Sequence, residues 1–296
     1  MQLPSPSASF GAVVALKPAA QAKSRLRELP VPLRERLARA MAVDTLRALA
    51  DAGAALVVVG ADDEMPGMLR RDRVVATLEP EPVPSGMNAA LEAGAGVLRS
   101  AGIDPVLACV GDLPALTADS IAALLDHFSR LDHADRPDQV GGAGSTDGVR
   151  SRRAFVPDRS GVGTTILIAT DGELEPRFQN ESAASHRSSG AVPIALDGYP
   201  ELRSDVDTSA DLATVIKLGV GARTAQLVDQ QRGRVADYTA VTVISSEPTE
   251  SSLVVSDAGV RMALPADSLD PRIRSVRTGQ RLHAAVVGSR LISAWW

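Results

Sequence analysis

The chain has 296 residues, of which 45% are hydrophobic and 23% are charged, and its formal net charge is −5. This balance is typical of a soluble globular protein, and the length is sufficient for one large α/β domain followed by a small second domain. The negative charge argues against broad attraction to nucleic acids or membranes, although it permits a local basic site.

Three further features favour a cytoplasmic protein. The N-terminal segment lacks the charged start and apolar core of a signal peptide, and no apolar stretch is long enough to span a bilayer. The single cysteine, Cys109, lies within the apolar run 106–110, which predicts a buried and inert thiol rather than a nucleophile.

Apolar runs predict buried strands at residues 10–16, 56–60, 74–76 and 105–110. Between them, helical spacing of apolar residues predicts helices over 31–52 and 86–100, and Thr117 is expected to cap a third helix. Strands and helices that alternate in this way indicate βαβ units. The fold class that we predict is therefore α/β, with a mainly parallel, Rossmann-like sheet and helices on both faces.

The second half of the chain changes character twice. Residues 130–150 are rich in Asp, Gly, Pro and Ser, which predicts an exposed loop. Further elements are then predicted, namely strands at 154–156 and 192–196, a helix around 175–188 and a helix capped by Thr208. After about residue 232, short strand-like runs alternate with turns, at 239–245, 252–256, 259–263 and 281–287. We expect one α/β domain over residues 8–231 and a small antiparallel β-barrel over residues 232–296.

Acidic side chains follow the predicted strands at two places. Asp112 comes directly after the strand 105–110, while Asp205 and Asp207 lie two residues apart in a segment before a helix. Open α/β sheets bind ligands at the carboxyl ends of their strands, and alternate residues of an extended segment share a face. The simpler interpretation makes Asp207 a helix cap and Asp205 a solvated acid. We favour a site for a divalent metal ion formed by Asp112, Asp205 and Asp207, because carboxylate oxygens are ligands that hard divalent ions prefer.

Basic residues are concentrated after the first predicted strand. Lys17, Lys23 and Arg25 precede the first helix, where α/β folds bind phosphates. A triphosphate needs such cations as pyrophosphate departs, so we take these three residues as candidate catalytic groups. The arginines of the following helix are assigned to its solvated face.

Two glycine-containing segments are candidate substrate contacts. Thr164 and Thr165 end a Gly-Val-Gly-Thr-Thr turn, whose N–H and hydroxyl groups suit a phosphate. Gly86 and Asn88 lie where a nucleotide base could approach. Alternatively, the first segment is an ordinary turn and the second merely begins a helix.

Several catalytic classes are excluded by missing motifs. The sequence has no G-x-x-x-x-G-K-[ST] motif, no evident Ser/His/Asp or Cys/His set, and no zinc pattern among its one cysteine and four histidines. A phosphate monoester is mostly dianionic at neutral pH, so it needs no general base to act as a nucleophile. Positioning and charge neutralisation then suffice for catalysis.

The strongest functional signal is a set of five motifs in fixed order: Ala15-Leu16-Lys17-Pro18 with Ala22-Lys23-Ser24-Arg25-Leu26, Gly86-Met87-Asn88-Ala89-Ala90-Leu91, Gly111-Asp112-Leu113-Pro114, Gly163-Thr164-Thr165, and Ser204-Asp205-Val206-Asp207-Thr208. The set resembles the 2-phospho-L-lactate/phosphoenolpyruvate guanylyltransferases of deazaflavin coenzyme F-420 biosynthesis. This resemblance covers roughly residues 10–220.

The resemblance implies a nucleotidyltransferase of the GT-A type, with GTP as donor and a small phosphorylated three-carbon acid as acceptor. It implies that Mg²⁺ is held by the three acids named above and that the acceptor phosphate lies near Thr164, Thr165 and Ser182. Similarity to the actinobacterial type favours phosphoenolpyruvate, whose carboxylate would be met by Arg177, His186 or Arg187. The chain departs from the family at residues 179–181, where Gln-Asn-Glu replaces a Gly-Pro-Gly-like turn.

The tail after residue 232, through its segment from Leu264 to Leu282, faintly resembles a cold-shock-like OB barrel. Nucleic-acid-binding OB folds need aromatic platforms and a basic groove, but this tail has few aromatic residues and its charges nearly cancel. We therefore expect an interaction module for a second copy of the chain or for a pathway enzyme, and not for nucleic acid.

Two other functions stay open at the level of sequence. One is a related nucleotidyltransferase that acts on a sugar phosphate or molybdopterin, for which the same acids and lysines would serve. The other is a non-catalytic nucleotide- or RNA-binding protein, in which the change at residues 179–181 marks lost activity.

Overall fold

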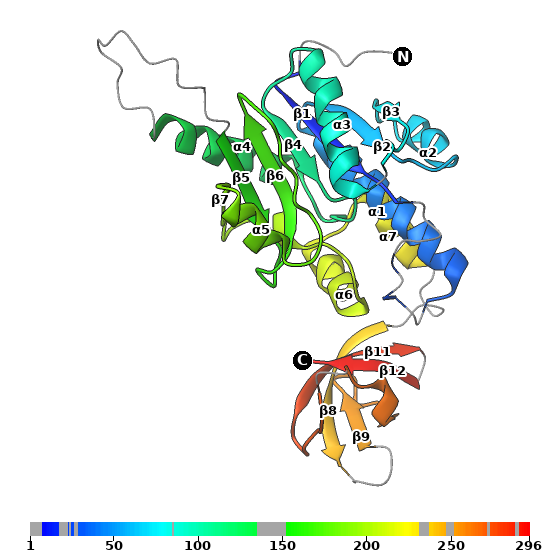
Figure 1. Cartoon of the computed structure of the whole chain (residues 1–296). Helices are drawn as coiled ribbons and strands as arrows, with labels where there is room; N and C mark the ends of the chain where they lie inside the picture. The colour runs from blue at the N-terminus through cyan, green and yellow to red at the C-terminus, as the bar shows by residue number, and fades with distance from the viewer. Residues whose placement is uncertain are drawn as a thin grey trace.

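The computed structural model describes residues 8–17, 23, 25–26, 29–84, 86–134, 152–230, 237–246, 252–270, 273–287 and 290–296. Strands and helices follow one another up to residue 230, mostly in alternation (Figure 1). The strands there are β1 (Phe10–Ala15), β2 (Ala54–Val59), β3 (Thr77–Glu79), β4 (Val106–Cys109), β5 (Arg152–Pro157), β6 (Thr164–Thr170) and β7 (Val192–Pro193). The α-helices are α1 (Val31–Asp51), α2 (Met65–Arg71), α3 (Met87–Ser100), α4 (Ala118–Ala134), α5 (Ser182–Ser188), α6 (Ser209–Leu218) and α7 (Ala222–Gln230), with a 3₁₀ helix at Pro200–Arg203.

The seven strands form one mixed sheet in the order β3-β2-β1-β4-β6-β5-β7. Strands β3, β2, β1 and β4 are parallel neighbours. Strand β6 runs antiparallel to both β4 and β5, while β7 is parallel to β5. The four parallel strands therefore end together at one edge of the sheet, and the loops that follow them share that edge.

Helices cover both faces of the sheet, as the sequence predicts. On one face, Phe10, Ala12 and Val14 of β1 pack in a core cluster that also contains buried residues of α1, α2 and α4. On the other face, Val13 packs in a cluster with α3 and α5. Successive residues of β1 thus point to opposite faces and are buried on both, which explains why this strand reads as a continuous apolar run.

The last part of the chain forms a second sheet. Its strands are β8 (Asp237–Ser245), β9 (Ser252–Ser256), β10 (Arg261–Leu264), β11 (Arg281–Val287) and β12 (Arg290–Trp295), with a 3₁₀ helix at Ala266–Ser268. They pair antiparallel in the order β10-β9-β8-β11-β12. The two terminal strands of this order also contact each other, so the sheet curls into a half-barrel. Alternate buried residues, such as Val241 and Val243, fill its own core cluster.

The predicted boundaries agree best where an element is long and strongly apolar. The first two strands and the helices α1 and α3 lie within two residues of their predicted positions. The third strand was predicted at 74–76 but lies at 77–79, and the helix predicted around 175–188 begins only at Ser182. Helix α4 extends to Ala134, into the predicted loop 130–150, and the rest of that loop lies outside the described residues. Within the part of the chain that the structure describes, every helix is too short or too polar to cross a bilayer.

Candidate active site

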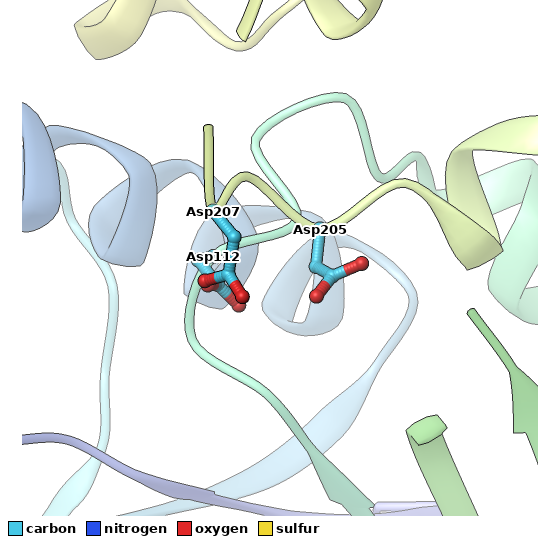
Figure 2. Close-up of side chains that lie close together, drawn as sticks. All are labelled: Asp112, Asp205 and Asp207. Atoms are coloured by element: carbon cyan, nitrogen blue, oxygen red, sulfur yellow. The ribbon is translucent and has the colours of Figure 1, made fainter. Parts of the chain in front are cut away.

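Three acidic side chains meet beyond the carboxyl end of β4. Asp112 lies in the loop after β4, while Asp205 and Asp207 lie in the segment that leads into α6. The backbone N–H of Val206 donates to the carbonyl of Asp112 at 3.2 Å and so joins the two segments. Val206 itself is fully buried and anchors the acids on either side of it. Carboxylate oxygens of the three acids lie within 4.8 Å of one another (Figure 2).

The start of α6 fixes the end of the second segment. Thr208 is the N-cap, and its hydroxyl accepts a hydrogen bond from the N–H of Asp211. In return, the carboxylate of Asp211 accepts from the N–H of Thr208 at 2.8 Å and from the N–H of Asp207 at 3.2 Å. This is a capping box, which satisfies the free N–H groups of the first helical turn. The interpretation of Asp207 as the helix cap is therefore wrong, and its carboxylate is left to the acidic cluster.

Lys23 brings a positive charge to this cluster. Its ammonium group donates to the carboxylate of Asp112 and lies 3.4 Å from Oδ1 of Asp207, and only 9% of the side chain is exposed. Burial alone lowers the pKa of Lys23, but the negative charges of Asp112 and Asp207 outweigh it and raise that pKa. Burial, followed by repulsion from Asp112 and Asp207, raises the pKa of Asp205 well above its usual range. The three carboxylates repel one another, and the ammonium group of Lys23 offsets part of this repulsion.

The chemistry of the cluster suits a divalent metal ion. Carboxylate oxygens are the ligands of hard cations such as Mg²⁺, and several of them must converge on one point. Here they converge, and the ammonium group of Lys23 shows that a positive charge is accommodated among them. Asp112, Asp205 and Asp207 therefore form a carboxylate cluster that could bind a metal.

A cavity of about 600 Å³ extends from the acidic cluster across the ends of the parallel strands. Its lining includes residues that follow each of these strands, namely Leu16 after β1, Gly60 after β2, Glu81 after β3 and Asp112 after β4. Gly60 has a φ of +77°, and a Cβ atom there would lie 2.6 Å from the carbonyl oxygen of Leu16. Only glycine fits this position, where the chain turns away from β2 close to the end of β1.

The three predicted cations line this same cavity. Lys17 follows β1 and is exposed. Arg25 is also exposed, and its guanidinium lies 3.1 Å from Oδ2 of Asp207. Together with Lys23, they give the cavity three positive charges next to the three acids.

Gly86 and Asn88, the predicted contacts of a nucleotide base, lie in different surroundings. Gly86 has a φ of +139° and lines the cavity just before α3. The side-chain amide of Asn88 instead donates to the carbonyl of Phe178 at 3.1 Å and accepts from the N–H of Phe178 at 2.9 Å. Asn88 therefore holds the loop before α5 in place, and its contact with substrate stays a prediction.

Thr164, Thr165 and Ser182 are buried and are not among the residues that line the cavity. Thr164 and Ser182 lie together through His186, because the Thr164 hydroxyl is 2.9 Å from Nδ1 of that histidine and Ser182 begins the helix that carries it. The hydroxyl of Thr165 donates to the carbonyl of Leu202 at 2.6 Å. Neighbouring residues of a strand point to opposite faces, so the two threonines cannot offer their hydroxyls to one phosphate from the same side. Their predicted role stays a prediction.

His186 is buried between Phe155 and Phe178 and is neutral. Burial, together with the positive charges of Arg153 and Arg177, lowers its pKa to about 4. The N–H of Arg177 donates to Nε2 at 2.9 Å, so Nδ1 carries the proton and donates to Thr164. Both ring nitrogens are therefore occupied, and His186 cannot provide the cationic contact for an acceptor carboxylate that the sequence suggested.

At residues 179–181, where the sequence departs from the family, the backbone has unusual φ angles. Gln179 has a φ of +107° and Asn180 a φ of +48°, both in the region that favours glycine. The turn thus keeps a conformation suited to glycine although the glycines are gone. Gln179 lines the cavity that Asp205 and Asp207 also line.

Two acids of the cavity were missed at the level of sequence. Asp62, after β2, accepts from Nε of Arg39 at 2.7 Å and from the N–H groups that begin α2. Glu81 lies two residues after β3. Placing the third strand at 77–79 instead of 74–76 would have revealed Glu81 as a residue at the carboxyl edge.

The fold and the site define a nucleotidyltransferase. Residues 19–153 match the family model of the MobA-like NTP transferase domain. The crystal structure of a putative nucleotide-diphospho-sugar transferase from Desulfovibrio desulfuricans G20 shares the fold, with a TM-score of 0.52 and 14% identity over 76% of this chain and 96% of that chain.

Closer relatives narrow this class to one family. The phosphoenolpyruvate guanylyltransferase of Streptomyces coelicolor is 41% identical over 217 residues, which cover 72% of this chain and 92% of the relative. The protein of the same name from Mycolicibacterium gilvum is 37% identical over 237 residues, or 77% of this chain and 99% of the relative. The chain belongs to the phosphoenolpyruvate guanylyltransferase family.

Proposed function

We propose that this protein transfers GMP from GTP to phosphoenolpyruvate and releases pyrophosphate. The observation that carries the proposal is the convergence of Asp112, Asp205 and Asp207 with Lys17, Lys23 and Arg25 on one cavity at the strand ends. The names of the relatives supply the donor and the acceptor. The resemblance noted in the sequence supports a role for this reaction in the biosynthesis of coenzyme F-420.

In this reaction an oxygen of the acceptor phosphate attacks the α-phosphorus of GTP. A new P–O bond forms, the bond between the α-phosphorus and the bridging oxygen breaks, and pyrophosphate leaves with the electron pair. The acceptor phosphate is mostly dianionic at neutral pH, so the chain needs no base to remove a proton from it. The work of the protein is to place the two phosphates in line and to offset their negative charge.

The acids and cations divide this work between them. Asp112, Asp205 and Asp207 would hold Mg²⁺, which when bound offsets the charge that develops on the phosphate oxygens. Lys17 and Arg25 supply further positive charge to the triphosphate from the same cavity. For the acceptor we propose the region of Thr164 and Ser182. The N–H at Nδ1 of His186 donates a hydrogen bond to the oxygen of Thr164, so the hydroxyl hydrogen of Thr164 remains available to a phosphate oxygen.

A competition assay tests the proposal. The purified chain is given GTP, MgCl₂ and equal concentrations of phosphoenolpyruvate, 2-phospholactate and a hexose 1-phosphate, and the products are identified by mass. We expect GMP joined to phosphoenolpyruvate as the main product, with one pyrophosphate released per turnover. A dominant GDP-sugar would overturn the assignment, a phospholactate adduct would overturn the choice of acceptor, and binding of GTP without any turnover would indicate a non-catalytic protein.

The acidic cluster is tested in the same assay. Asp112→Asn removes the charge of one proposed ligand while keeping its volume, so turnover should fall by at least about a hundredfold without loss of the fold. Asp126→Asn is the matched control, because Asp126 is an exposed acid of α4 that pairs with Arg130 and belongs neither to the cluster nor to the cavity lining. Equal losses in the two variants would contradict the assignment of Asp112.

A further inference from the structure

The order of the strands determines how far the acidic cluster lies from the other end of the cavity. Asp112 follows β4 and Glu81 follows β3, and these strands are separated in the sheet by β1 and β2. Three strand spacings amount to about 14 Å, which is comparable to an extended nucleoside with its first phosphate. If the α-phosphorus reacts beside the acids after β4, as the proposed function requires, the base of the nucleotide lies toward β3.

Glu81 is the carboxylate at that end which is free to meet a base. It lines the cavity and is exposed, and its Oε1 accepts a hydrogen bond from the N–H of Gly86 at 3.2 Å. Asp62 also lines the cavity, but Arg39 and the first N–H groups of α2 already occupy its oxygens. Among the cavity acids in the described residues, Glu81 is therefore the one outside both the acidic cluster and an ion pair.

The chemistry of a free carboxylate discriminates between purines. Guanine presents two donors side by side, the N1–H and the N2 amino group, and a carboxylate accepts from both. Adenine presents an unprotonated N1 at the same place, whose lone pair would face the negative charge. Met87 lines the same cavity, is partly exposed and offers apolar surface to the face of a ring.

We propose that Glu81 reads the Watson–Crick edge of guanine and so makes the chain specific for a guanine nucleotide. The inference rests on the proposed function, because it places the reacting phosphorus at the acidic cluster. It adds a specificity-determining residue to the donor site, at the edge strand of the sheet and opposite the end where the chemistry takes place.

Replacing Glu81 by glutamine tests the proposal through the choice of base. In Glu81→Gln the amide oxygen can still accept from N1–H, but the amide nitrogen is a donor that faces the N2 amino group of guanine. Xanthine carries a carbonyl oxygen at that position and would accept from the amide. Calorimetric titration of the full chain with GTP and with XTP, both with MgCl₂, should therefore show weaker binding of GTP and tighter binding of XTP. We expect the ratio of the two affinities to change by at least about tenfold, the usual value of one two-point base contact.

Asp63→Asn is the matched control, because it removes one negative charge from the loop after β2. Asp63 is exposed and is not among the residues that line the cavity. This variant should keep the GTP/XTP ratio of the unmodified chain. An unchanged ratio in Glu81→Gln would overturn the role of Glu81, while GMP transfer by the unmodified chain would still support the proposed function. If the unmodified chain bound GTP and ATP equally well, guanine specificity itself would fail.

Discussion

At the scale of single residues, Lys23 contacts two of the acids that are proposed to bind a metal ion. Its backbone has a φ of +57°, which is unusual for a lysine, and its ammonium group is held among acids that would also hold a metal ion. A cation at this place is needed in either state, because three adjacent carboxylates repel one another in its absence. A metal ion that bound these acids would therefore compete with the lysine for them.

This competition leads to a prediction for Lys23→Met. Without a metal ion, loss of the ammonium group should lower the free energy of unfolding by about 1–3 kcal/mol, because the acids lose their counter-charge in a partly buried place. Addition of MgCl₂ should then raise the melting temperature more in the variant than in the unmodified chain, since no ammonium group has to be displaced. The measurement is a thermal melt in EDTA and in MgCl₂, without nucleotide.

Arg25→Met is the control for Lys23→Met. Arg25 also contacts Asp207, but 72% of its side chain is exposed, so its removal should change both melts little. A response to MgCl₂ that is the same in Lys23→Met and in the unmodified chain would contradict the competition.

The sequence predicted which acids lie together, but not the side chains that contact them. The acids are found from the strand that each segment follows, whereas the contacts join residues far apart in the chain. Asp112 follows a strand whose apolar run is unmistakable, and the rule that strand ends bind ligands then applies directly. The contact between Lys23 and Asp112 joins residues 89 positions apart through a loop, and no periodic pattern encodes it. The same holds for Thr165, whose hydroxyl looked available until the structure placed the carbonyl of Leu202 beside it.

At the scale of elements, the segment before α5 shows how side chains replace regular structure. A helix was predicted from residue 175, but Glu175, Gln179 and Asn180 all have positive φ angles. Side chains hold this backbone instead: Asn88 bonds both polar groups of Phe178, and His186 accepts from the N–H of Arg177. These partners lie outside any window of sequence from which a helix is predicted.

Helix α7 and strand β12 were missed for related reasons. In α7 only Thr224 and Leu227 are buried, which gives too weak an apolar period to detect. The N-terminus of α7 is capped from α1, where the carboxylate of Asp44 accepts from the N–H groups of Arg223 and Thr224 at 3.0 and 2.7 Å. Strand β12 is defined by pairing with β11. Long-range partners therefore decide both elements.

The strained turn at Gln179 gives a prediction at the same scale. Gln179→Gly should raise the free energy of unfolding by about 1 kcal/mol, because glycine adopts a φ of +107° without the steric cost that a side chain carries. Gln179→Ala should not, since alanine loses the same polar group but keeps the Cβ atom. Urea unfolding of the two variants separates backbone strain from loss of the side chain. Equal stability of the two variants would show that the turn carries no strain.

At the scale of the whole molecule, each hydrophobic core is built from residues on one side only of position 232. The clusters on the two faces of the mixed sheet, and a third α/β cluster built mainly from α1, α6 and α7, draw all their buried members from residues 10–227. The cluster of the half-barrel draws its buried members from Val241 to Ala294. We therefore propose that the chain consists of two domains, with the boundary near residue 232 that the change in sequence pattern predicts.

The two-domain proposal predicts the behaviour of a chain that ends at Gln230. Every acid and cation assigned to the site precedes this residue, and so does each buried member of the three α/β clusters. In addition, 92% of the Streptomyces coelicolor relative is matched by only 72% of this chain, so more than a quarter of this chain lies outside the matched region. The shortened chain should fold and should transfer GMP at a rate within about twofold of the full chain, because distant and independent parts contribute additively. Circular dichroism and the pyrophosphate-release assay are the measurements. If the shortened chain were folded but inactive, the half-barrel would have to contribute to the site, and if it failed to fold, the two cores would not be independent.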